Sequence, residues 1–159
     1  LVFNDSDFYL LDASDFSSFS LPVNIPSDLQ YDKVKFNVGV DSLTNVSGAM
    51  GGNLDPAKGM YWTWQSGYIN CKIEGTCSNC QTRNNEFQLH LGGYSEPFNC
   101  LQRMEFQHNP NSKNIQLELD LKKFIETSYL SVHPNVMSPN VEAVRLSALF
   151  KSCFSISKQ

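Results

Sequence analysis

Apolar and polar residues alternate along several short segments, and this alternation limits the possible folds more than any other feature. Residues 31–40 read YDKVKFNVGV, which places Val34, Phe36 and Val38 on one face of an extended strand and lysines on the other. Residues 86–92 alternate in the same way, and residues 114–121 are expected to point Ile115, Leu117, Leu119 and Leu121 inward. Residues 102–107 give another strand, and a tight turn at 109–112 would pair it with residues 114–121. The pattern predicts mostly antiparallel strands.

Shorter segments complete the predicted fold. Residues 7–12 predict a short strand, residues 19–21 a strand-like piece, and residues 153–156 a terminal strand. Residues 120–125 could begin a short helix. Only Ser138-Pro139-Asn140, followed by apolar residues at helical spacing, gives a convincing helix signal. Without a βαβ rhythm, we expect an all-β fold, an antiparallel β-sandwich or open barrel (Ig-like or jelly-roll-like), with one short C-terminal helix.

Length and charge set further bounds. The 159 residues suit one domain with a real core, so residues 1–159 are expected to form a single β-sandwich domain. A net charge of −4 and the lack of any basic run argue against a nucleic-acid partner. No apolar stretch has the length of a transmembrane segment. The chain starts at Leu1 without a methionine, as a mature or partial chain would.

Both tryptophans of the chain lie in the stretch NLDPAKGMYWTWQSGYIN at residues 53–70. In an extended strand Met60, Trp62 and Trp64 would project from one face. Ser66-Gly67 would then interrupt the strand as a bulge or kink. From physical reasoning alone, the two indoles are core anchors of a sandwich.

A long loop is expected between residues 41 and 58, and a loop of this length in a compact domain is usually functional. It carries four oxygen donors that could surround a calcium ion, namely Asp41, Asn45, Asn53 and Asp55. Their spacing does not match an EF-hand loop, so the first interpretation is that they form turns.

The five cysteines are Cys71, Cys77, Cys80, Cys100 and Cys153. Cys77-Ser-Asn-Cys80 is a CxxC in a polar loop, without the βαβ context of a redox active site. Structural disulfides are the first interpretation, either Cys77–Cys80 or pairings with Cys71 and Cys100. A zinc site comes second and redox catalysis third. Disulfides would place the protein outside the cytoplasm.

Motifs of catalysis are missing from the chain. The three histidines, His90, His108 and His133, are far apart, and neither HExxH nor GxSxG occurs. The glycine run at 48–52 precedes a strand and not a helix, so it lacks the geometry of a phosphate-binding loop. We therefore expect a protein that is not an enzyme. His90 is the one histidine of interest, on the strand face opposite Phe87, Leu89 and Leu91; a lone strand histidine is usually solvated or hydrogen-bonded.

Several motifs together resemble one known family. The run NLDPAKGMYWTWQSGYINCKIEG, followed by FQLHLGG, is similar to the C-terminal core of the MbnP/MopE-type copper proteins. The segments FYLLD, VKFNVGVD and MSPN…LSALFKSCFSI resemble the branch found in Bacteroidetes-like genomes. The resemblance begins near Phe8 and implies that a further N-terminal strand or two is missing. It also implies a bacterial protein of the periplasm, the outer-membrane surface or the secreted fraction, such as a lipoprotein.

The resemblance implies copper(I) bound by histidine nitrogens and by a kynurenine that a dihaem partner enzyme produces from tryptophan. His90 matches a family copper ligand, and the modified residue would be Trp62 or Trp64. The family's second histidine lies nearer the N-terminus, and no histidine precedes His90 here. It either belongs to the missing segment or was lost in this branch. The alternative is a metal-free β-sandwich module, an accessory subunit of a cell-surface or outer-membrane complex.

Overall fold

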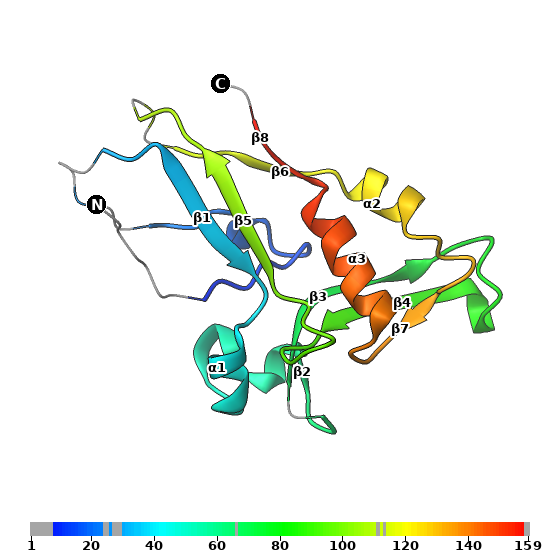
Figure 1. Ribbon diagram of the computed structural model, residues 1–159. Helices are drawn as coiled ribbons and strands as arrows, with labels where there is room; N and C mark the ends of the chain where they lie inside the picture. The colour runs from blue at the N-terminus through cyan, green and yellow to red at the C-terminus, as the bar shows by residue number, and fades with distance from the viewer. Residues whose placement is uncertain are drawn as a thin grey trace.

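Three small sheets organise the computed structural model, which describes residues 8–23, 26, 30–65, 67–110, 112 and 114–157. The main sheet has the strand order β2-β3-β4-β7, formed by Tyr61–Trp62, Gly67–Thr76, Glu86–Gly92 and Asn135–Val136. A two-stranded ribbon pairs β1 (Lys33–Val38) with β5 (Gln102–Gln107), and a short pair joins β6 (Leu117–Leu119) to β8 (Phe154–Ile156). Figure 1 shows helix α3 (Val141–Lys151) between the β1–β5 ribbon and the main sheet, and it contacts both β5 and β4.

Alternation correctly predicted the most regular strands. In β1 the side chains of Val34, Phe36 and Val38 are half-buried, whereas the polar residues between them are exposed. Strands β4 and β5 have the bounds that the pattern predicts. Strand β3 pairs antiparallel with β4 along most of its length, with a bulge at Asn70. The main sheet is thereby built around one long hairpin.

The core lies between the main sheet and the two C-terminal helices. Leu89 and Leu91 of β4, Leu146 of α3 and Phe124 of α2 (Leu121–Thr127) have no exposed surface. The Phe124 ring meets Phe150 edge-on, with 5.3 Å between centroids. Helix α3 begins where the sequence predicts, because the Asn140 side chain accepts a hydrogen bond from the Ala143 amide at 2.8 Å.

The prediction of an all-β fold with a single helix is corrected. The chain is mostly β, but it has three α-helices, and β7 pairs parallel to β4. No closed barrel occurs in the described part of the chain. The expected loop at 41–58 instead holds helix α1 (Ser42–Val46) and two 3-10 turns, η2 (Gly52–Leu54) and η3 (Pro56–Lys58). Asparagine and aspartate caps can start such short helices without any apolar periodicity, so the pattern did not reveal them.

The predicted hairpin between residues 102–107 and 114–121 is wrong. Strand β5 pairs with β1, and β6 pairs with β8. Leu117, Leu119 and Leu121 were expected to point inward, but all three are exposed. An alternating pattern identifies a strand without identifying its partner, because pairing depends on residues distant in sequence. Of the predicted turn, Asn111 lies outside the described residues.

The N-terminal strands are also corrected. Residues 8–12 form no strand, and Asp7 lies outside the described residues. Asp12 and Asp15 make an isolated bridge, and their side chains accept hydrogen bonds from Ser14 and Ser17. These local bonds favour a turn over an extended strand. The piece expected at 19–21 follows the 3-10 turn η1 (Phe16–Phe19). Another 3-10 turn, η4 (Arg83–Asn85), leads into β4.

Candidate metal centre

His90 projects from the face of β4 opposite the core. Its neighbours Leu89 and Leu91 point inward, so strand alternation places the imidazole on the other face, as predicted. The imidazole is nevertheless only 7% exposed. Its Nε2 lies 2.7 Å from Oε1 of Glu74 on the neighbouring strand β3. His90 is therefore a buried, hydrogen-bonded side chain held in a defined orientation.

Trp62 packs against Gly92, which lies two residues from His90 along β4. A Cβ placed on Gly92 would meet the six-membered ring of Trp62 at 2.8 and 2.9 Å, so the ring packs directly against this glycine. Gly92 and His90 are two residues apart on β4, and their side-chain directions share one face about 7 Å apart. The fold thus packs the Trp62 ring against β4, on the side from which His90 projects.

The indole nitrogen of Trp62 is a buried hydrogen-bond donor without a partner. Trp62 is 5% exposed, and its Nε1 is buried without a hydrogen-bond partner. A buried donor left unpaired costs about 1–3 kcal/mol. A change that gives this nitrogen a partner therefore stabilises the folded protein.

Trp64 does not continue the strand. Strand β2 ends at Trp62, and the Gln65 amide donates to the Trp62 carbonyl at 3.4 Å, closing a turn over residues 63–65. The Trp64 side chain is 66% exposed, which corrects the expectation that both indoles anchor the core. The two rings remain in contact, with centroids 5.9 Å apart and an angle of 47°. Ser66, in the predicted strand break, lies outside the described residues.

The other histidines have different surroundings. His108 stacks on Tyr31 at 4.8 Å, and its Nε2 lies 3.0 Å from the Ser112 carbonyl oxygen. His133 is exposed after helix α2. Across the described ranges, no three or more His, Cys, Asp or Glu side chains gather as a metal site. The candidate site at His90 therefore has one histidine, and the Trp62 ring packs against Gly92, two residues further along β4.

All four proposed calcium donors make hydrogen bonds within the protein, and the two aspartates among them cap short helices. Asp41 caps α1 by accepting from the Thr44 amide at 2.9 Å, and Asp55 caps η3 in the same way. Asn45 is buried, with its amide bonded to the Val40 carbonyl and its oxygen to the Tyr68 amide. Asn53 bonds to the Phe8 carbonyl and to Lys58. The two aspartates thus agree with the first interpretation from the sequence, whereas the two asparagines join segments that are distant in the chain.

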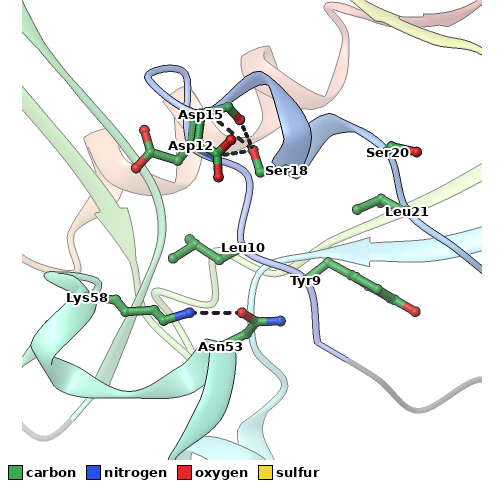
Figure 2. A pocket seen from close by; sticks show the side chains of 9 residues that line it. All are labelled: Tyr9, Leu10, Asp12, Asp15, Ser18, Ser20, Leu21, Asn53 and Lys58. Carbon is green, nitrogen blue, oxygen red and sulfur yellow. Dashed lines mark hydrogen bonds between the residues drawn. The ribbon is translucent and has the colours of Figure 1, made fainter.

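A separate hollow of about 460 Å³ lies beside Asn53 (Figure 2). The N-terminal segment forms one wall, where Asp12 and Asp15 accept hydrogen bonds around Ser18. Lys58 reaches across the floor to Asn53 at 3.0 Å. No sequence motif predicts this hollow, although aspartates and serines are frequent in residues 12–20. None of its lining residues belongs to the His90 site.

All five cysteines are free thiols in the structure. They nevertheless share one region, since Cys80, Cys100 and Cys153 belong to the core and Cys71 and Cys77 pack against it. Burial raises the pKa of the Cys71 thiol to about 12, and burial also raises that of Cys100. These two thiols are protonated and unreactive at neutral pH.

Replacing Gly92 with alanine is expected to displace the Trp62 ring. The new methyl would lie 2.6 Å from the Tyr68 carbonyl oxygen as well as against the ring, and the backbone oxygen cannot turn aside. Overpacking of this kind costs about 1–3 kcal/mol of unfolding free energy. Denaturant unfolding and the tryptophan emission maximum measure the two effects. Gly51→Ala is the matched control, because nothing lies within 4 Å of its Cβ; equal behaviour of the two variants would contradict the packing at Gly92.

Comparisons with known proteins gave one match. A family model described as MbnP matches residues 2–138, which is well over half of the chain. No curated protein and no solved structure matches. Within the described residues, no helix has the length and apolar character needed to cross a membrane.

Proposed function

The chain belongs to the MbnP family, and from this premise we propose that it is an extracytoplasmic protein that binds copper(I). The observation that carries the proposal is the buried imidazole of His90, with the Trp62 ring packed against Gly92 two residues along β4 and its Nε1 buried without a partner. Imidazole is a good ligand for copper. Copper is the cargo here, so the role is acquisition or handling of the metal and not catalysis.

Trp62 is the tryptophan that we assign to the site. An intact indole N–H only donates hydrogen bonds and cannot bind a metal. Oxidative opening of the ring to kynurenine leaves this nitrogen as an aryl amine, whose lone pair can bind copper. Because Nε1 of Trp62 is buried and unpaired, the change supplies a partner where one is missing. The Trp64 ring contacts the Trp62 ring but is exposed, so a dihaem partner could reach it at the surface.

Glu74 is a positioning residue in this proposal. Its carboxylate holds Nε2 of His90 at 2.7 Å, so Nδ1 is the nitrogen left for the metal. Histidine ligands commonly use their second nitrogen in this way, which sets the orientation and basicity of the ring. Among the described residues, no group of three or more His, Cys, Asp or Glu side chains surrounds His90.

The test is to express the chain with and without a dihaem partner enzyme and to map the peptide containing residues 60–72 by mass spectrometry. We expect kynurenine at Trp62, only with the partner, and one copper(I) per oxidised chain in competition with a chromogenic copper(I) chelator. Modification at Trp64 alone would reassign the donor. Intact indoles together with no copper binding would overturn the proposal.

That last result would favour the second candidate, a metal-free β-sandwich interaction module in a cell-surface or outer-membrane complex. Exposed apolar side chains support it: Leu43 and Val46 of α1 are 80% and 73% exposed, and Trp64 is also exposed. Exposed apolar groups of this size are typical of protein-binding surfaces when they cluster. Both candidates place the protein in the periplasm, on the outer membrane or outside the cell.

A further inference from the structure

The CxxC motif between β3 and β4 forms a pair of thiols with unequal surroundings. The Cys77 amide donates to the Asn85 carbonyl at 2.8 Å, which ties it to the end of the hairpin. The Cys80 amide donates to the Cys77 carbonyl at 2.9 Å and closes a tight turn. Turns of this kind hold their first and fourth Cα atoms within about 7 Å, close to the 4.4–6.8 Å that disulfides require.

The two sulfurs differ in access. Cys77 is half-buried at the rim of the loop, whereas Cys80 is 1% exposed and its Sγ lies 3.5 Å from the Leu130 carbonyl oxygen. The thiols also share a hydrogen bond, which lowers the pKa of Cys77. Burial, and then the bond to Cys77, raise the pKa of Cys80 to about 11. Cys77 is thus the accessible thiol and Cys80 the protected one.

We propose that Cys77 and Cys80 form a thiol–disulfide exchange site, in which Cys77 attacks a low-molecular-weight disulfide and Cys80 resolves the adduct. This site is distinct from His90 and does not depend on copper binding. The proposal selects one of the pairings that the sequence left open. It also assigns a different role to each cysteine.

The exchange is balanced in two steps. The Cys77 thiolate attacks one sulfur of the incoming disulfide, whose S–S bond breaks and releases one thiolate. Cys80 then gives up its proton to solvent, and its sulfur attacks Cys77 and expels the second thiolate. The protein dithiol loses two electrons and two protons, and the small disulfide is reduced to two thiols. The product is a Cys77–Cys80 disulfide that closes the β3–β4 connection beside Leu130.

The test uses the full reduced chain and oxidised glutathione. Thiol titration of the unfolded product should fall from five thiols per chain to three, and peptide mapping should join Cys77 to Cys80. In Cys80→Ala, glutathione should remain trapped on Cys77. In Cys77→Ser, the buried Cys80 should gain no glutathione in the folded protein. Cys153→Ala is the matched control and should still form the Cys77–Cys80 bond.

Three results would overturn the proposal: no loss of thiols in the folded wild-type chain, a disulfide that includes Cys71 or Cys100, or an adduct on Cys80 in Cys77→Ser. The wild-type mapping decides the pairing even where a variant folds poorly. Circular dichroism of each variant shows whether its result refers to the folded state. Because copper is absent from the assay, failure here leaves the proposed function standing.

Discussion

Replacing His90 with alanine is expected to reduce the copper(I) affinity of the oxidised protein by more than about 100-fold, because loss of a ligand exceeds the 10–100-fold loss typical of an outer-shell partner. Among the described residues of the main sheet, His90 is the only histidine. Competition with a chromogenic copper(I) chelator measures the affinity. Peptide mapping on the same sample confirms that Trp62 is still converted.

Two variants make this result specific. Glu74→Gln keeps His90 but weakens the bond to its Nε2, so a smaller loss of about 10–100-fold is expected. His133→Ala removes an exposed imidazole and should leave the affinity unchanged. If His90→Ala binds copper as tightly as the wild type while remaining folded, the assignment of the site is wrong.

The largest effect on stability is expected at Phe124. Its ring has no exposed surface and packs edge-on against Phe150, where α2 meets α3. Phe124→Ala should lower the unfolding free energy by about 3–5 kcal/mol, through lost burial and the cavity that remains. Denaturant unfolding followed by circular dichroism measures this change.

Phe16→Ala provides the matched control, since it removes the same ring from a side chain that is 79% exposed. A change within about 0.5 kcal/mol is expected there. Equal costs at Phe16 and Phe124 would contradict the placement of the core between the main sheet and the C-terminal helices.

Local sequence patterns were sufficient to predict the most regular strands and the start of the last helix. The alternation in EFQLHLG defined β4 and placed His90 opposite the core face, because successive strand residues point to opposite sides. Asn140 before an apolar run defined the start of α3, because a capping side chain acts within one turn. The family resemblance is confirmed over residues 2–138.

The contacts of the candidate site could not be predicted from local sequence patterns. No local pattern indicates that Trp64 leaves the strand after Trp62, or that Glu74 on β3 reaches His90 on β4. The same holds for Cys80, whose burial depends on Leu130, fifty residues further along the chain.

The sequence by itself therefore determined the most regular strands, β1, β4 and β5, the start of the last helix and the face that the residues of β1 and β4 take. Tertiary structure alone decided the strand partners, the burial of His90 and Trp62 together, and the inequality of Cys77 and Cys80. The physical reason is the separation along the chain over which each effect acts. Periodicity and capping act over a few residues, whereas pairing, burial and the environment of a titrating group depend on atoms that only folding brings together.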